Sequence, residues 1–309
     1  MSKTNGTNGT AAASRFDPNF TAAVINATGP KANPRLKQLV GGLVQHLHDF
    51  LRENEVTLDE YFAAIDMINR AGQMSNAKRN EGQLLSDILG MESLCDEITS
   101  TLAAEAADQP TATAILGPFW RKDAPAYAMG DSIVKGFPDA DHTLMHGRVL
   151  DFDTGTPIAN AEVDIWHTAP NGLYESQDPE QPDMNLRGRF HTGPDGRYSL
   201  YCLRPTKYPI PDDGPAGELL GLLDRHPWRP AHIHFIISAE GYKSVVTQIF
   251  DRRDEHITDD VAFAVKESLV VDFAPRQGDP KGKFELEYDF KLVSFEAGKK
   301  YGMPGAKNA

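Results

Sequence analysis

The feature that most constrains the fold of this chain is a change in hydrophobic periodicity near residue 110. Between residues 35 and 104 the apolar residues recur with the 3.6-residue period of an amphipathic helix. Beyond residue 110, Pro, Gly and Asp become frequent and apolar residues alternate with polar ones, as in half-buried strands. The sequence therefore predicts an α+β chain, mainly β, in which a helical N-terminal unit packs on an antiparallel β-sandwich.

Three helices are expected in the N-terminal unit. The first covers Leu36 to Leu51, where seven apolar residues keep the helical period. Thr57 and Glu60 have the spacing of a capping box, which would open the second helix. Apolar residues from 84 to 102 mark the third. Their exposed stripes would face either the sandwich or a second copy of the chain.

The strand-rich part shows repeated strand–turn–strand patterns. Val163 and Ile165 alternate with polar neighbours, and Asp153-Thr154-Gly155 has the composition of a turn. We therefore expect four segments along the chain: a disordered N-terminus over residues 1–15, a helical domain over 16–110, a β-sandwich catalytic domain over 111–294 and a loose tail over 295–309.

Composition excludes several classes of function. The net charge of −13 argues against nucleic acid as a partner, because phosphate binding needs clustered Lys and Arg. No apolar run reaches the length of a membrane span, and the polar N-terminus has no signal core. Two distant cysteines form neither a disulfide framework nor a thiolate metal site. These features favour a cytoplasmic protein.

His232 and His234 are the strongest candidates for metal ligands. They lie in an apolar segment that suits a strand, where residues i and i+2 point to the same face. Imidazole suits Zn, Cu, Fe and Ni, so the pair alone does not identify the metal. No carboxylate or cysteine lies in this strand. Tyr174 and Tyr208, in turn-rich segments, are the other anionic candidates, although tyrosine is also common at loop bases.

Seven motifs, in order, give the chain a resemblance to a known family. They are ILGPFW (115–120), GRVLDFDTGTPIANAEVDIWH (147–167), NGLY (171–174), DGRYSL (195–200), KYPIPDDGP (207–215), HPWRPAHIHF (226–235) and TQIF (247–250). Together they resemble the intradiol ring-cleavage dioxygenases, and most closely the catechol and hydroxyquinol 1,2-dioxygenases. The resemblance covers residues 20 to 294 and implies a transthyretin-like sandwich for the catalytic domain.

The resemblance implies one Fe(III) per chain, held by Tyr174, Tyr208, His232 and His234. Small aromatic diols or triols and O2 are the implied substrates, and the ring opens between its two oxygen-bearing carbons to give a dicarboxylic acid. Tyr208 corresponds to the ligand that leaves when substrate chelates, and it takes up a substrate proton. Arg229 corresponds to the arginine over the ring, which stabilises negative charge. Gln248 corresponds to a residue on the oxygen-handling side.

The helical part is expected to supply one wall of the substrate site. Leu84 and Asp87 share a helix face at i, i+3, and the resemblance places this pair in hydroxyquinol dioxygenases. We therefore expect hydroxyquinol (1,2,4-trihydroxybenzene) as preferred substrate, giving 3-hydroxy-cis,cis-muconate or its tautomer maleylacetate. Catechol, giving cis,cis-muconate, is the alternative, and Trp120 departs from the Tyr or Phe expected there. The remaining residues expected to bind substrate are Ile115, Leu116, Gly117, Pro118, Phe119, Ile210, Pro211 and Arg229.

Two further implications concern assembly. By resemblance, the helical region forms a homodimer and encloses a phospholipid-like molecule in an apolar tunnel. Two other functions stay open from the residues alone. One is a zinc hydrolase that uses His232 and His234, and the other is a non-catalytic transthyretin-like binding module.

Overall fold

The computed structural model describes residues 16–76, 79–102 and 108–303. The segment 1–15, expected to be disordered, lies outside these residues. The chain divides into two units, Met1–Asp66 and Met67–Ala309. The boundary lies within a helix rather than at residue 110, because the helices that follow it pack with the strand-rich part.

The helices of the first unit begin where the sequence supplies caps. They are α1 (Phe20–Asn26), α2 (Pro34–Glu53) and the start of α3 (Leu58–Met74). The Asn33 side chain accepts hydrogen bonds from the first backbone N–H groups of α2, and Pro34 follows it. The capping box is confirmed, because Glu60 accepts from the Thr57 N–H at 2.8 Å and Thr57 Oγ1 accepts from the Glu60 N–H.

The predicted third helix is two helices in the structure. They are α4 (Glu81–Ile88) and α5 (Met91–Ser100), so the expectation of one helix over 84–102 was wrong. The break occurs at Gly90, whose φ of +69° is left-handed and cannot continue a helix. The apolar residues before and after Gly90 have the spacing of a single helix, so the hydrophobic pattern did not reveal the break.

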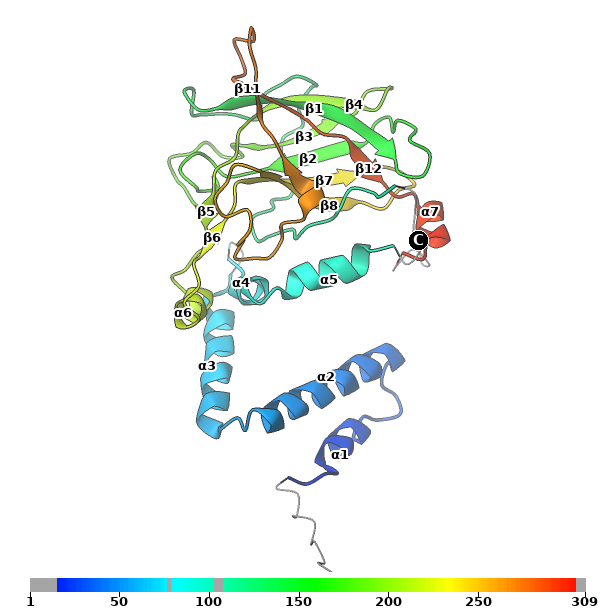
Figure 1. Cartoon of the computed structure of the whole chain (residues 1–309), viewed down its shortest axis with the longest axis vertical. Coiled ribbons are helices and arrows are strands. Elements are labelled where there is room, and N and C mark those ends of the chain that lie inside the picture. Colours follow the sequence, from blue (N-terminus) through cyan, green and yellow to red (C-terminus); the bar gives the residue numbers. More distant parts are fainter. Residues whose placement is uncertain (1–15, 77–78, 103–107, 304–309) are drawn as a thin grey trace, which may run out of the picture. The chain divides into compact units, whose positions relative to one another are not determined.

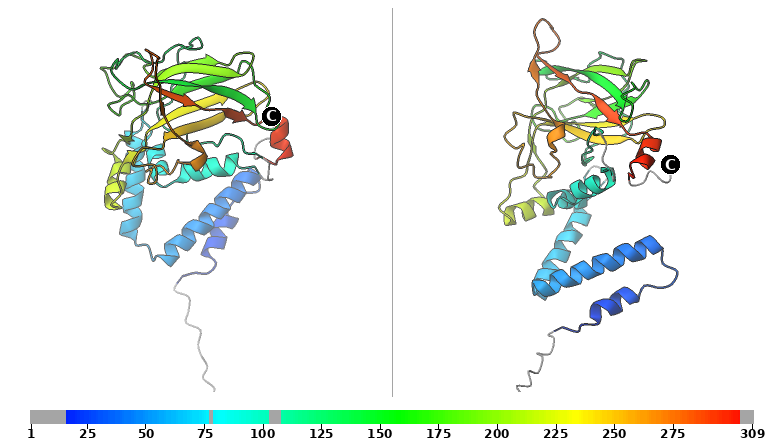
Figure 2. Two further views of the ribbon diagram at one scale, coloured as in Figure 1. Left: turned by 45° about the horizontal axis from the view of Figure 1, so that its top comes forward. Right: turned by 45° about the vertical axis from the view of Figure 1, so that its right-hand side comes forward.

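The second unit contains a β-sandwich of two five-stranded sheets (Figures 1 and 2). The first sheet has the order β10–β11–β1–β12, and β4 also pairs with β1. Its strands are β1 (His142–Asp151), β4 (Arg197–Leu203), β10 (Ala274–Pro275), β11 (Phe284–Glu287) and β12 (Phe290–Leu292). The second sheet has the order β3–β2–β7–β8–β9. Its strands are β2 (Glu162–Trp166), β3 (Arg187–His191), β7 (His232–Ser238), β8 (Val245–Asp251) and β9 (Val270–Val271).

The core lies between the inner faces of the two sheets. Ile165, Phe235 and Ile249 from the second sheet meet Met145 and Phe290 from the first, and all are fully buried. The sandwich was expected to be antiparallel, but β1 pairs in parallel with β11 and β12, and β8 pairs in parallel with β9. The strands of each parallel pair are joined by a long connection and not by a hairpin, which allows both strands to run in the same direction.

Four further short elements belong to the second unit. The two-residue strands β5 (Tyr208–Pro209) and β6 (Trp228–Arg229) pair with each other, and α6 (Pro215–Leu222) lies between them in sequence. A single 3-10 turn, η1 (Glu267–Leu269), precedes β9.

The C-terminal segment is more ordered than the sequence indicated. Residues Phe295–Lys300, expected to be part of a loose tail, form the helix α7. Ser294 caps it by accepting a hydrogen bond from the Ala297 N–H at 3.1 Å, and Ala297 packs with Phe152 and Val293. Residues 304–309 of the expected tail lie outside the described residues. Among the helices that the structure describes, none is long and apolar enough to cross a membrane.

Candidate metal centre

Two histidines of β7 meet on the outer face of the second sheet. Ile233 and Phe235 point into the core, so His232 and His234 share the opposite face, with side chains almost fully buried. Their Nε2 atoms lie 3.0 Å apart. The Nδ1–H of His232 donates to the Pro230 carbonyl oxygen at 2.7 Å, so the Nε2 of neutral His232 carries the lone pair, on the side of the ring that faces His234.

The His234 ring is fixed by its neighbours. It stacks on Trp166 at 4.9 Å between ring centroids, with 9° between the planes. Gly117 covers it, and a Cβ there would lie 3.3 Å from the imidazole Cε1. The φ of +71° at Gly117 also favours glycine. The loop that carries Gly117 therefore needs a residue without a side chain to approach the imidazole.

Two tyrosines complete the cluster. Tyr208 lies in β5 opposite Arg229, and Tyr174 follows a turn closed by the hydrogen bond from the Gly172 N–H to the Ala169 carbonyl. The two phenol rings meet edge to face at 5.7 Å, and the Tyr208 ring lies 5.4 Å from the ring of His232. Tyr174 Oη is buried and has no hydrogen-bond partner.

Burial sets the charge of all four side chains. Burial lowers the pKa of His232 to about 3 and that of His234 well below its usual value, so both imidazoles are neutral. Burial raises the pKa of Tyr174 and of Tyr208 above the usual value. A polyvalent cation would oppose that effect on the phenols, because a bound metal favours the deprotonated ligand.

This donor set fits a ferric ion. Two neutral imidazoles and two phenolates supply borderline nitrogen and hard anionic oxygen donors, and the phenolates offset two of three metal charges. A buried phenol oxygen without a partner is costly in a protein interior. Coordination would satisfy it.

Arg229 joins this cluster to a buried carboxylate. Its Nε and Nη2 donate to the two carboxyl oxygens of Asp260, each at 3.1 Å, and its Nη1 lies 3.1 Å from His232 Nε2. The side chains of Arg229 and Asp260 are 3% and 2% exposed, so this is a buried ion pair. Burial alone would lower the pKa of Arg229, but the Asp260 carboxylate reverses this and keeps the guanidinium charged.

Gln248 connects the arginine to the loop over the histidines. Its Oε1 accepts from Arg229 Nη2 at 2.9 Å, and its Nε2 donates to the Ile115 carbonyl at 2.7 Å. Gln248 lies opposite His234 in the β7–β8 pairing. The sequence had singled out both Arg229 and Gln248 but missed Asp260, which is distant in sequence and belongs to no periodic pattern.

A second buried ion pair supports Tyr174, and the sequence analysis missed it too. Arg187 Nε donates to Glu175 at 2.7 Å, and Arg187 Nη1 donates to the Phe119 carbonyl at 2.7 Å. The Phe119 ring stacks on Tyr174 at 4.5 Å. The guanidinium of Arg187 also lies over the Tyr174 ring, 5.6 Å from its centroid, so these contacts hold the tyrosine in place. No periodic pattern marked Arg187, because its strand β3 also carries Arg189 and His191, so that polar residues alternate along it.

The residues expected to bind substrate fall into three groups. Leu84 and Ile210 pack in one buried cluster with α6, whereas Leu116 and Phe119 pack on Trp166, Tyr174 and Tyr208. Ile115 packs instead with Phe250, and its carbonyl binds Gln248. Pro118 lies between Gly117 and Phe119, and Pro211 follows Ile210. Both prolines are half-buried. Trp120 is partly exposed and donates its indole N–H to Asp164.

Asp87 is buried, on the same side of α4 as Leu84. Its residue exposure is 4%, and its Oδ1 has no hydrogen-bond partner. Burial, helped by the neighbouring Glu92, raises the pKa of Asp87 to about 8. The carboxyl group is therefore mainly neutral near pH 7.

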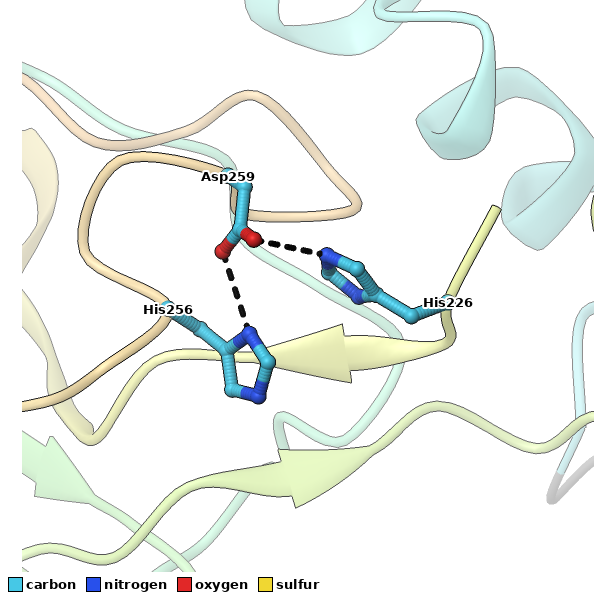
Figure 3. Close-up of side chains that lie close together, drawn as sticks. All are labelled: His226, His256 and Asp259. Carbon is cyan, nitrogen blue, oxygen red and sulfur yellow. Dashed lines mark hydrogen bonds and ion pairs between the residues drawn. The ribbon is translucent and has the colours of Figure 1, made fainter. Parts of the chain in front are cut away.

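Another cluster of ionisable side chains contains His226, His256 and Asp259 (Figure 3). Asp259 lies 3.2 Å from His226 Nε2 and 3.0 Å from His256 Nδ1. The Trp228 N–H donates to Nδ1 of His226, so the Nε2 of the neutral ring carries the proton and donates it to Asp259. Asp259 thus accepts hydrogen bonds from both histidine rings. His226 has no free nitrogen lone pair for a metal, because its Nδ1 already accepts from the Trp228 N–H.

Family models match most of the chain. A model described as "Dioxygenase" matches residues 115–294, and one described as "Catechol dioxygenase N terminus" matches residues 33–107. The first covers the sandwich with all four clustered side chains, and the second covers α2 to α5.

Individual relatives match over nearly their full length. The intradiol ring-cleavage dioxygenase prcA of Aspergillus niger is 46% identical, with 90% of this chain and 89% of that protein covered. The catechol 1,2-dioxygenase of Candida albicans is 44% identical, with coverages of 89% and 92%. The crystal structure of hydroxyquinol 1,2-dioxygenase from Pseudomonas putida superimposes with a TM-score of 0.80 at 38% identity, covering 89% of this chain and 97% of that one.

Proposed function

This chain belongs to the intradiol ring-cleavage dioxygenase family, and from that premise we propose that it cleaves hydroxyquinol in preference to catechol. The family membership makes the chain an enzyme, so the alternatives of a zinc hydrolase and a non-catalytic module lose their support. A relative named for catechol is 44% identical in sequence to this chain, and one named for hydroxyquinol is 42% identical. The substrate preference must therefore be argued from the site itself.

The cofactor of the proposed reaction is one Fe(III) per chain. The observation that carries this is the convergence of His232, His234, Tyr174 and Tyr208, buried together with an unpartnered phenol oxygen. When held by these four residues, Fe(III) would supply the Lewis-acid chemistry that makes an aromatic diol reactive toward O2.

The protein's own groups bind, orient and move protons around that centre. The Tyr208 oxygen is the proposed acceptor of a substrate proton, because its phenol lies beside His232 and opposite Arg229. Arg229, kept charged by Asp260, is placed to stabilise negative charge that develops on the ring. Gln248 fixes the orientation of Arg229 against the loop at Ile115.

The proposed preference for hydroxyquinol rests on Asp87. Its Oδ1 is a buried acceptor without a donor, which the third hydroxyl of hydroxyquinol would supply. Catechol has no hydroxyl at that position and would leave the acceptor unsatisfied, at a cost of about 1–3 kcal/mol. That cost corresponds to a ratio of kcat/KM between the two substrates of about 5- to 150-fold.

Oxygen uptake with catechol, hydroxyquinol and protocatechuate, compared in one assay, tests the proposal. The wild-type enzyme should be fastest on hydroxyquinol, and Asp87→Ala should reduce the preference by about 5- to 150-fold, mainly through slower hydroxyquinol turnover. A wild-type enzyme that prefers catechol, or equal losses on both substrates, would contradict the assignment and leave catechol as the substrate.

We also propose that the chain forms a homodimer through its helical region. The apolar stripe of α2 supports this, because none of its residues is buried within the chain. The stripe comprises Leu36, Leu39, Val40, Leu43, Leu47, Phe50 and Leu51. An exposed apolar face of this length is typical of an interface. We also propose that the apolar faces of the helical region hold a phospholipid-like molecule. Lipid extraction followed by mass spectrometry would test this.

A further inference from the structure

Arg225 joins two segments that lie far apart in the sequence. It follows α6, in a turn closed by the hydrogen bond from its own N–H to the Leu220 carbonyl at 2.9 Å. Its Nη1 donates to the carbonyl of Ile88 at 2.6 Å, and its Nη2 donates to the carbonyl of Val261 at 3.1 Å. A planar guanidinium presents its donors in a fixed fork, so Arg225 sets the positions of the two carbonyls relative to each other.

The Ile88 carbonyl belongs to the helix that supplies one wall of the proposed substrate site. Ile88 is the last residue of α4, where backbone carbonyls lack a partner within the helix and the helix dipole favours a cation. Leu84 and Asp87, which we call the α4 wall, lie on this helix, and Leu84 packs with Ile88 and Val261 in one buried cluster. Arg225 therefore fixes the end of α4 at the residue that follows Asp87.

The Val261 carbonyl belongs to the loop that holds the buried arginine of the site. Residues 260–264 fold around the Asp260 carboxylate, which accepts hydrogen bonds from two backbone N–H groups of the loop, at 3.2 and 3.0 Å. The same carboxylate pairs with Arg229. Since Val261 directly follows Asp260, the Arg225 guanidinium connects α4 to the Arg229–Asp260 pair through one short stretch of backbone.

Two further contacts fasten this loop to the corner between α4 and α5. The Phe263 ring lies under the Arg225 guanidinium, 4.8 Å from its centroid, and also meets Gly90, where a Cβ would lie 3.4 Å from the ring. The φ of Phe263 is +54°, which a phenylalanine adopts only where its surroundings hold it. Ser93 Oγ donates to the Ala262 carbonyl at 2.9 Å. A change at Arg225 is therefore transmitted to α4 and is not absorbed by a loosely packed loop.

We propose that Arg225 is a positioning residue that holds the α4 wall at a fixed distance from Arg229. Under the proposed function, the aromatic ring of the substrate contacts Arg229 and the α4 wall together, so the spacing of these groups sets how tightly the ring is held. Arg225 acts through the two carbonyls and not by contact with the ring. This inference rests on the proposed function, because it extends the role given to Leu84 and Asp87.

Arg225→Met tests the proposal, because methionine keeps a long side chain but has no donor for either carbonyl. Leu84 and Asp87 are themselves retained, so the displaced wall should weaken binding more than the chemical step. KM for hydroxyquinol should rise at least about 5-fold, while kcat changes by less than about 2-fold. KM for catechol should rise less, because catechol has no third hydroxyl to reach Asp87. The matched control is Arg197→Met, an exposed arginine of β4 that pairs with Asp195, and it should leave both constants unchanged.

A purely structural role for Arg225 gives a different result. Urea unfolding would then show a lower midpoint, but folded Arg225→Met, normalised to its iron content, would keep the wild-type KM for both substrates. That result overturns the proposal. If Arg225→Met fails to fold, Arg225→Lys decides, because an ammonium is a point donor that cannot span both carbonyls as the guanidinium fork does. Arg225→Lys should raise KM for hydroxyquinol at least about 3-fold, and an unchanged KM overturns the proposal.

The same measurements separate this inference from the proposed function. A wild type that prefers hydroxyquinol, together with an unchanged KM in folded Arg225→Met, rejects the inference alone. A wild type that prefers catechol rejects the proposed substrate instead. In that case KM for catechol tests the inference, because the α4 wall would border either ring: a rise in Arg225→Met supports the positioning role, and an unchanged value overturns it.

Discussion

Removal of the Asp260 carboxylate should destabilise the protein far more than an ordinary surface mutation. In Asp260→Ala, Arg229 loses two charge-assisted hydrogen bonds of 3.1 Å and remains as a cation that is 3% exposed. Breaking a buried pair by removing one partner costs about 3–5 kcal/mol of the free energy of unfolding. The N–H groups of Ala262 and Ala264 also lose their acceptor, which adds to the loss.

Denaturant unfolding of the metal-free protein measures this effect directly. The exposed pair Arg252–Glu267 gives a control, because Glu267→Ala should leave the free energy of unfolding nearly unchanged. Oxygen uptake should also fall in Asp260→Ala, since Arg229 would no longer be held beside His232. A loss of stability below about 1 kcal/mol would refute the reasoning, because it would mean that water or another group already neutralises Arg229.

Three other changes have defined outcomes. Tyr208→Phe should keep its iron while kcat falls sharply, because the proposed proton acceptor is lost; metal analysis and steady-state kinetics check this, and an unchanged kcat would rule out the role. Asp87 has its pKa raised from 3.8 to about 8, so its contribution to stability is full below about pH 4 and is lost as the pH rises toward 8. Urea titrations at about pH 5 and pH 7.5 should show the wild type losing about 3 kcal/mol relative to Asp87→Asn, and parallel curves would count against the shift. Light scattering should give about twice the 34.0 kDa of one chain, and a monomer would end the dimer proposal.

Local rules predicted the parts of the site that lie on regular elements. The period of a strand placed His232 and His234 on one face, and the period of a helix placed Leu84 and Asp87 together, both of which the structure shows. The capping box at Thr57 was also correct, because such a signal depends on residues close in sequence. Tyr174 lies on a loop and Tyr208 in the two-residue strand β5. Neither position follows from a periodicity, so only the family resemblance brought the two tyrosines to the same site.

Features that depend on tertiary contacts escaped the sequence analysis. Asp260 lies 31 residues from Arg229, and only the need of a buried guanidinium for a counter-charge would have prompted a search for it. The raised pKa of Asp87 could not be predicted, because it depends mainly on burial by residues that are distant in sequence. Parallel pairing of β1 with β11 likewise depends on a long connection and not on local turns.

The most direct test of the central claim combines metal analysis with visible absorption of the purified protein. If Tyr174, Tyr208, His232 and His234 hold Fe(III), the wild type should contain about one iron per chain and show a tyrosinate-to-iron charge-transfer band. His232→Ala should lose both the iron and the colour, because a four-ligand site seldom retains its ion after losing one ligand. Active wild-type protein with stoichiometric zinc and no iron, or a His232→Ala variant that keeps its full colour, would contradict the account.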